Sequence, residues 1–274
     1  MIIAAVGAAA RPVPAGGGYA WPDNDRLGAT VDPNRELEIT EAIRDRARVE
    51  DATVAVRHVC AVAASVMNAM GVGVYLVSDL GPIEPVHATD PVGARLVELQ
   101  VVLGAGPATV AVAEDLPVLI ADLDTAASRG HWPMFAPEAL AEGVRAIFAF
   151  PIGANGVTIG ALEIYRAGAG LLSPAELSDA WLFADAAMAL IMAGVSDAPT
   201  VTEYGLFASE FGERWAEVHQ ATGMVAAQLG VDPTTAFLRL RARAFTSGEG
   251  LSRLAEDILA GRTRLDNGKD TEAP

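Results

Sequence analysis

The chain has 274 residues and carries 35 acidic against 19 basic side chains, which gives a formal charge of −16. This length suggests one or two domains with enough residues to bury a core. Hydrophobic residues make up 51 % of the sequence and charged residues 20 %, which argues against a largely disordered chain. The acidity excludes a broadly basic nucleic-acid-binding surface, although it leaves room for a small local one.

Cys60 is the single cysteine, so the chain cannot form an internal disulfide or a four-cysteine metal site. This cysteine usage favours a reducing, cytoplasmic location. The longest strongly apolar run, residues 186–195, is far shorter than the ~20 residues that span a bilayer, so we expect no membrane segment. None of the four histidines has a partner at metal-ligand spacing, and we expect neither a metal nor another cofactor.

Residues 1–34 are rich in Gly, Ala and Pro and lack a sustained period, which predicts a flexible N-terminal arm. A helical period begins near Arg35, with its apolar stripe at Leu37, Thr40, Ile43 and Ala47. A second helix is predicted over residues 53–70, ended by Gly71, with its apolar stripe at Val56, Val59, Ala63, Val66 and Met70.

The middle of the chain changes to a strand-like pattern. Residues 72–78 form a nearly continuous apolar run, and shorter strands are predicted at residues 85–89 and 117–121. The strongest signal is at residues 144–151 and 157–166, which flank Asn155-Gly156. Asn-Gly suits a type I′ turn because both central residues need positive φ, so these two segments predict a β-hairpin.

Two further helices are predicted around these strands. Gly104-Ala-Gly-Pro107 lacks the Lys and Ser/Thr of a phosphate-binding loop, so it predicts a turn into a helix near residues 108–114. Ser173 and Glu176 have the spacing of a capping box and open a helix that ends near residues 194–197. Helices before and after antiparallel strands predict an α+β domain over residues 35–195, with helices packed on one sheet face.

The rest of the sequence is purely helical. One long helix is predicted over residues 204–229, ended by Gly230, and Asp232-Pro233 opens a second one to about Thr246. A short third helix covers residues 251–259. Together they predict an all-α three-helix bundle over residues 204–265, joined by a linker at residues 196–203 and followed by a disordered tail at residues 266–274.

The second helix of this bundle carries Arg239, Arg241 and Arg243 beside its apolar stripe. Residues 218–265 hold six Arg against four acids, a local charge of +2, which leaves −18 for the rest of the chain. A small cationic surface is what recognition of a phosphate backbone needs. By charge alone, an ordinary solvated helix face is the favoured explanation of the pattern.

Within the bundle, His219-Gln-Ala-Thr-Gly-Met-Val225, Gln228-Leu-Gly-Val231 and Leu240-Arg241 with Ala244 resemble the ANTAR domain, the RNA-binding module of bacterial antiterminators. Upstream, Leu103-Gly-Ala-Gly-Pro107, Leu116–Asp122, Trp132-Pro-x-Phe135 and Val144–Pro151 resemble the GAF domain of actinobacterial GAF–ANTAR regulators. The resemblance implies an α+β GAF sensor domain, a homodimer, and a bundle that binds dual hairpins in nascent RNA. It names no small-molecule or protein signal for the GAF half.

The resemblance also directs the choice of site residues. The expected RNA-binding residues are Gln220, Thr222, Gly223, Arg239, Arg241 and Arg243. The family often has Lys where Thr222 stands, so fewer phosphate contacts are expected here. The candidate ligand pocket of the GAF half is lined by Gly106, Thr109, His131, Trp132 and Phe135.

Two other functions remain open at this stage. The chain could be a small-molecule sensor or dimeric scaffold whose C-terminal helices bind a protein partner. A reductase of free methionine sulfoxide ranks last, because that chemistry needs a second thiol beside Cys60. We therefore expect no enzymatic activity.

Overall fold

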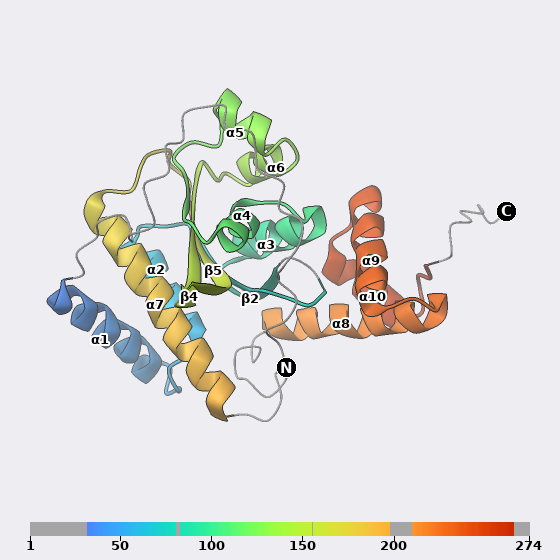
Figure 1. Ribbon diagram of the computed structural model, residues 1–274, viewed down its shortest axis with the longest axis horizontal. Helices are drawn as coiled ribbons and strands as arrows, with labels where there is room; N and C mark the ends of the chain where they lie inside the picture. Colours follow the sequence, from blue (N-terminus) through green and yellow to red (C-terminus); the bar gives the residue numbers. More distant parts are fainter. Residues whose placement is uncertain (1–31, 81–82, 155, 198–209, 266–274) are drawn as a thin grey trace.

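The computed structural model describes residues 32–80, 83–154, 156–197 and 210–265 (Figure 1). The predicted arm lies outside these ranges up to residue 31, as do residues 198–203 of the predicted linker and the predicted tail at 266–274. Within the described ranges, an α+β domain precedes a separate group of three helices (Figure 1).

The α+β domain is built on a five-stranded antiparallel sheet with the strand order β2-β1-β5-β4-β3. The strands are β1 (Gly71–Leu76), β2 (Glu84–Ala88), β3 (Val118–Ile120), β4 (Ala146–Ala154) and β5 (Val157–Arg166). All five predicted strands are present. The predicted hairpin is β4–β5, and Gly156 has the positive φ of 74° that its turn requires.

Helices cover both faces of this sheet, so the expectation of one covered face was wrong (Figure 1). On one face lie α1 (Pro33–Val49), α2 (Val56–Val66) and α7 (Pro174–Asp197). The other face carries α3 (Pro91–Leu103), α4 (Pro107–Glu114) and the short α5 (Ala126–His131) and α6 (Phe135–Ala141). In β4, Ile147 and Ala149 pack into one core while Phe148 and Phe150 pack into the other, which is the two-residue alternation of a strand buried on both sides.

Two helix predictions need correction, and helix α3 was missed. In α1 the predicted Ile43 and Ala47 are buried, but Ile39 takes the inward position expected for Leu37, which is 54 % exposed. Helix α2 ends at Val66, and Gly71 is the first residue of β1, where an added Cβ would lie 1.9 Å from the Asp90 carboxylate. Helix α3 was not predicted, although Asp90 caps its N-terminus as Asp232 does in the bundle.

Other local predictions are confirmed. Helix α4 begins at Pro107, after the turn at Gly104–Gly106. At the start of α7, the amide of Glu176 donates to Ser173 Oγ at 3.2 Å and the amide of Ser173 donates to Glu176 Oε2 at 2.7 Å, which completes the capping box.

The three C-terminal helices are α8 (Glu210–Leu229), α9 (Pro233–Ser247) and α10 (Leu251–Leu259). Asp232 caps α9, since its Oδ1 accepts the amide of Thr235 at 2.9 Å. The buried residues of this bundle include Val218, Val225, Phe237, Leu240, Leu254 and Ile258. Residues 204–209 of the predicted long helix lie outside the described ranges.

The bundle packs against one side of the α+β domain, where α8 contacts β2 and α9 contacts α3 (Figure 1). In the described part of the chain, no single helix is long and apolar enough to cross a membrane. The bent pair α3 and α4 meets that test jointly, by length and composition, with an angle of 61° between its helices.

Candidate functional site

Two residues expected to contact RNA lie open on the surface of α8. Gln220 is exposed, and Gly223 is exposed with no heavy atom within 4 Å of the position that a Cβ would occupy. Helix α8 therefore presents bare backbone at Gly223, with room for another chain to approach closely.

Thr222, on the same helix, is placed differently. Its side chain is buried, and its hydroxyl donates to the backbone carbonyl of Val218 at 2.7 Å. This bond to the residue four positions earlier is the usual way in which a helix satisfies a buried threonine. The hydroxyl of Thr222 is therefore turned into the bundle and faces no ligand in this arrangement.

The three arginines of α9 differ in their surroundings. Arg243 is exposed and Arg239 is half-exposed. Arg241 points toward the α+β domain, where its Nε donates to the backbone carbonyl of Val102 at 3.2 Å. Burial lowers the pKa of the Arg241 guanidinium from its ordinary value, and no charged group contributes to that shift.

The turn between α3 and α4 receives Arg241. Gly104 has φ of +63°, and a Cβ there would lie 2.1 Å from Nη2 of Arg241. On the inner side of the same turn, a Cβ at Gly106 would lie 2.2 Å from Oε1 of Gln100. Both glycines thus allow a side chain to approach the turn, one from the bundle and one from the core.

Beneath this turn lies a buried polar cluster that the sequence analysis missed. The Tyr75 hydroxyl donates to Glu163 Oε2 at 2.6 Å, and Gln100 Nε2 donates to the same oxygen at 2.8 Å. Gln100 Oε1 accepts the amide of Ala108 at the start of α4, at 2.9 Å. The sequence did hold one signal, since Glu163 is the single acid within the apolar strand β5.

Glu163 is the unusual member of the cluster. Its carboxyl is fully buried, and its Oε1 has no hydrogen-bond partner among the residues that the structure describes. Burial raises the pKa of Glu163 to about 7, since the hydrogen bonds from Tyr75 and Gln100 only partly offset the loss of water. The group therefore changes charge near neutral pH.

The residues proposed to line a ligand pocket are mostly packed. Trp132 and Phe135 are buried in the core that faces α3 and α4, so they fill this space. Thr109 lies nearby on α4, and its buried hydroxyl has no partner within the described ranges. His131 is exposed and meets Trp132 edge to face, with ring centroids 4.4 Å apart.

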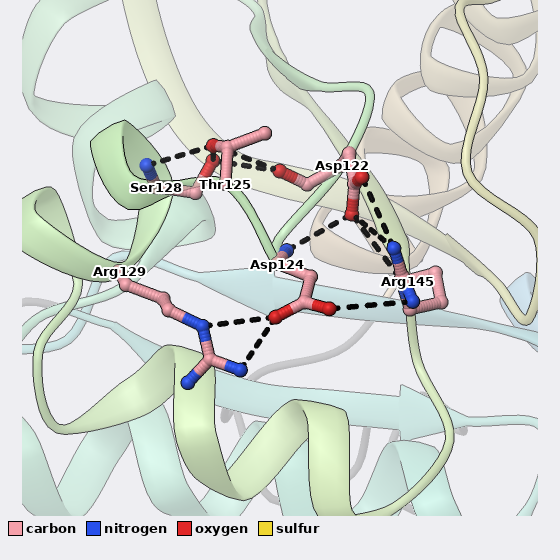
Figure 2. Close-up of polar contacts among 6 residues, drawn as sticks. All are labelled: Asp122, Asp124, Thr125, Ser128, Arg129 and Arg145. Carbon is pink, nitrogen blue, oxygen red and sulfur yellow. Dashed lines mark hydrogen bonds and ion pairs between the residues drawn. The ribbon is translucent and has the colours of Figure 1, made fainter.

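The loop that leads to His131 is fixed by ionic contacts, which Figure 2 shows. Asp122 accepts two hydrogen bonds from Nη2 of Arg145, at 3.0 and 3.1 Å, and Asp124 accepts Nε of Arg129 at 3.0 Å. Thr125 caps α5 by accepting the amide of Ser128 at 3.1 Å. Because every ion pair here is partly exposed, we regard the network as positioning α5 and contributing little stability.

Two acidic residues join the α+β domain to the bundle. The carboxylate of Glu84, on β2, pairs with the ring of His219 on α8. The carboxylate of Glu98, on α3, accepts the amide of Ser252 at the start of α10 at 2.6 Å. Between them lies a cleft of about 490 Å³ whose lining includes His87, Asp90 and Glu98 on one side and Arg214, Trp215 and Ser252 on the other.

The described residues offer no evidence for catalysis or metal binding. They contain no group of three or more His, Cys, Asp or Glu side chains that could hold a metal ion. Cys60 is fully buried, and burial raises the pKa of its thiol, so it is not an activated nucleophile.

Comparison with known proteins matches both parts of the chain. The GAF domain model matches residues 51–193 and the ANTAR domain model matches residues 213–259. The GAF domain of a phosphoenolpyruvate-protein phosphotransferase from Coxiella burnetii is 14 % identical, with 59 % of this chain and 96 % of that chain covered and a TM-score of 0.44. The corresponding Acinetobacter domain is 12 % identical, with coverage of 61 % and 98 % and a TM-score of 0.44. No curated protein matches the chain.

Proposed function

Because the chain belongs to the GAF domain family and ends in an ANTAR domain, we propose that it binds dual hairpins in nascent RNA and thereby favours antitermination. ANTAR domains are RNA-binding modules of antitermination regulators, and GAF domains are sensors. The pair is therefore regulatory in kind. We propose that a signal received by the GAF domain controls when the ANTAR bundle binds RNA.

The observation that carries this proposal is the exposure of several expected RNA-binding residues on α8 and α9. Gly223 offers open backbone, Gln220 offers an exposed amide, and Arg243 offers an exposed guanidinium that can pair with phosphate or stack on an unpaired base. Arg239 adds a second, half-exposed cation on α9. The local charge of +2 over residues 218–265 supports this interpretation, since phosphate contacts supply much of the affinity of proteins for RNA.

For the sensor half, we propose that the signal acts on the core between the sheet and helices α3 and α4. Glu163 Oε1 and Thr109 Oγ1 are buried there without partners among the described residues. A buried polar atom without a hydrogen-bond partner lowers the stability of the folded protein. A small molecule that forms a hydrogen bond with one of these two atoms, or a proton that binds the carboxyl, would therefore bind favourably. The side chains of Trp132 and Phe135 would have to move to admit a larger ligand.

We also propose that the protein is a homodimer. A bundle of about 60 residues buries little apolar surface by itself and gains stability from a partner. Trp215 on α8 is buried beside residues of the GAF domain, and this meets part of that need within one chain. Sedimentation of the full chain tests the remainder, because a monomer at micromolar concentration would contradict the dimer.

A gel shift tests the central proposal. The full chain should bind a dual-hairpin RNA more tightly than an RNA of equal length in which one stem is scrambled. The comparison cancels bulk electrostatic attraction, which both RNAs share. Equal affinity for the two RNAs would contradict the proposal and favour a scaffold whose C-terminal helices bind a protein.

A further inference from the structure

Three polar contacts across the junction follow one pattern. The GAF domain supplies the acceptor in each: the carboxylate of Glu84, the carboxylate of Glu98 and the carbonyl of Val102. The bundle supplies the donor in each, from His219, Ser252 and Arg241 respectively. Hydrogen-bond acceptors of the GAF domain thus bind three donors of the bundle, which is the domain proposed to bind RNA.

Two of these contacts involve the helices that carry the expected RNA-binding residues, α8 and α9. His219 precedes Gly223 by four residues on α8, so the two lie one helical turn apart. On α9, Arg241 projects from the side opposite Arg239 and Arg243, and its guanidinium rests on the α3–α4 turn. The GAF domain therefore covers Arg241 and contacts α8 at His219, while Arg243 stays exposed.

One polar contact of the docked state can be exchanged for a contact with RNA. Arg241 is half-buried against a neutral carbonyl, although a guanidinium forms stronger bonds to a phosphate. The remaining contacts are two carboxylates at partly exposed positions. A cleft of about 490 Å³ lies at the junction, beside a buried apolar core that joins Trp215 and Leu251 of the bundle to Val101 of α3. Separation would expose this apolar surface, so the signal has to offset that cost.

We propose that this docked arrangement is the autoinhibited form of the protein, in which the GAF domain withholds Arg241 and the His219 turn of α8 from RNA. The inference rests on the proposed function, and it names the regulation of the same site. Release would expose Arg241 and would also separate the bundle from a domain whose residues 35–195 hold 20 acids against nine Arg, a formal charge of −11. That acidic domain repels a polyanion held close to it.

The α3–α4 turn connects this junction to the sensor core. Gly104 contacts Arg241 on the outside, and Gly106 contacts Gln100 on the inside. Gln100 in turn holds Glu163 and the first turn of α4. A ligand or proton that rearranges Gln100 would therefore shift the surface on which Arg241 rests.

The test uses the full chain and leaves the proposed RNA-binding residues intact. The double variant Glu84→Gln/Glu98→Gln removes two carboxylates of the junction and should bind the dual hairpin roughly fivefold more tightly or better, as expected for a modest coupling free energy. The matched control is Glu36→Gln/Glu41→Gln on α1, which makes the same change in net charge far from α9 (Figure 1). Small-angle X-ray scattering of both proteins should show a larger radius of gyration for the junction variant alone.

The outcomes separate the two proposals. Tighter binding and expansion of the junction variant, relative to the α1 variant, support autoinhibition. Equal affinities of the two variants, with wild type still preferring the dual hairpin, overturn autoinhibition and leave the RNA function standing. If neither the wild type nor either variant prefers the dual hairpin, the proposed RNA function is contradicted. If the radius of gyration of the junction variant is also unchanged, the proposed separation of the two domains is contradicted as well.

Discussion

Arg241 donates a hydrogen bond to the backbone carbonyl of Val102, a residue 139 positions earlier in the chain. This contact joins the α9 helix of the ANTAR bundle to the last turn of α3 in the GAF domain. Under the proposed function, Arg241 has two competing partners, a neutral carbonyl in the docked chain and a phosphate in RNA. The strength of RNA binding should then depend on whatever changes the fit between the two domains.

The contact between Gly104 and Arg241 allows the fit between the two domains to be tested. Replacing Gly104 by Ala places a methyl group 2.1 Å from Nη2 of Arg241, and it also strains a residue with φ of +63°. We expect Gly104→Ala to loosen the junction, raise the affinity for RNA and increase the radius of gyration. Gly143→Ala is the control, because φ there is +83° and nothing lies within 4 Å of the added Cβ.

The strain of the left-handed backbone is common to both glycine variants and should lower each melting temperature by a similar amount. Only contact with Arg241 distinguishes them. If Gly143→Ala expands the protein and strengthens RNA binding as Gly104→Ala does, the effect belongs to general destabilisation and not to the junction.

Arg243 should carry an RNA contact in both docked and released forms because it is exposed. Arg243→Ala should weaken dual-hairpin binding and reduce the slope of log affinity against log salt by about 1, as the loss of one phosphate contact predicts. Circular dichroism should not change. Arg44→Ala, on exposed α1, removes the same charge elsewhere, and an equal loss of affinity in that variant would remove Arg243 from the site.

Arg241→Ala should behave differently from Arg243→Ala. It removes a donor that RNA can use, which weakens binding, and it removes a junction contact, which favours release. The net affinity should therefore fall less than in Arg243→Ala, while the radius of gyration rises. Affinity measured beside scattering distinguishes this from a residue that serves only one of the two roles.

Glu163 should make the stability of the GAF domain depend on pH. Below pH 4.5 the carboxyl is protonated in the folded and unfolded chain alike, and burial of the neutral group incurs no charge penalty. Between pH 4.5 and about 7 only the unfolded chain ionises, so stability falls by up to about 1.4 kcal/mol per pH unit. Above the raised pKa of Glu163, the free energy of unfolding no longer changes with pH on account of this group.

Glu163→Gln removes this titration. The free energy of unfolding of the variant, relative to wild type, should therefore rise from pH 4.5 to about 7 and level off beyond it. Urea unfolding at pH 5, 6, 7 and 8 measures the difference. His87 titrates in both proteins and cancels in the comparison, although burial lowers its pKa to about 4. A difference that does not vary with pH would show that Glu163 has an ordinary pKa.

Cys60 provides a test of the GAF core. Its side chain is fully buried in α2, and burial raises the thiol pKa, so both access and reactivity are low. A thiol-specific reagent should leave the native protein unmodified and should modify one group per chain in denaturant. Rapid modification of the folded protein would contradict the packing of α2 against the sheet.

Three predictions of local structure, whose causes lie within a few residues, agree with the structure. The Ser173–Glu176 capping box, the Asp232 cap and the Asn-Gly hairpin depend on residues within a few positions of one another, and all three predictions agree with the structure so far as it describes them. Helix α3 carried a similar signal in Asp90-Pro91 and was overlooked. Its omission also led to the expectation of a sheet covered on one face.

The sequence by itself determined the two kinds of domain, their order and the small excess of Arg over acids in residues 218–265. Periodicity, caps and composition encode these features along the chain. Only the tertiary structure decided that Arg241 lies against Val102, that Thr222 faces inward and that Glu163 shares a buried cluster with Tyr75. Such contacts join residues far apart in sequence, and which of them form depends on how whole elements pack rather than on any local pattern.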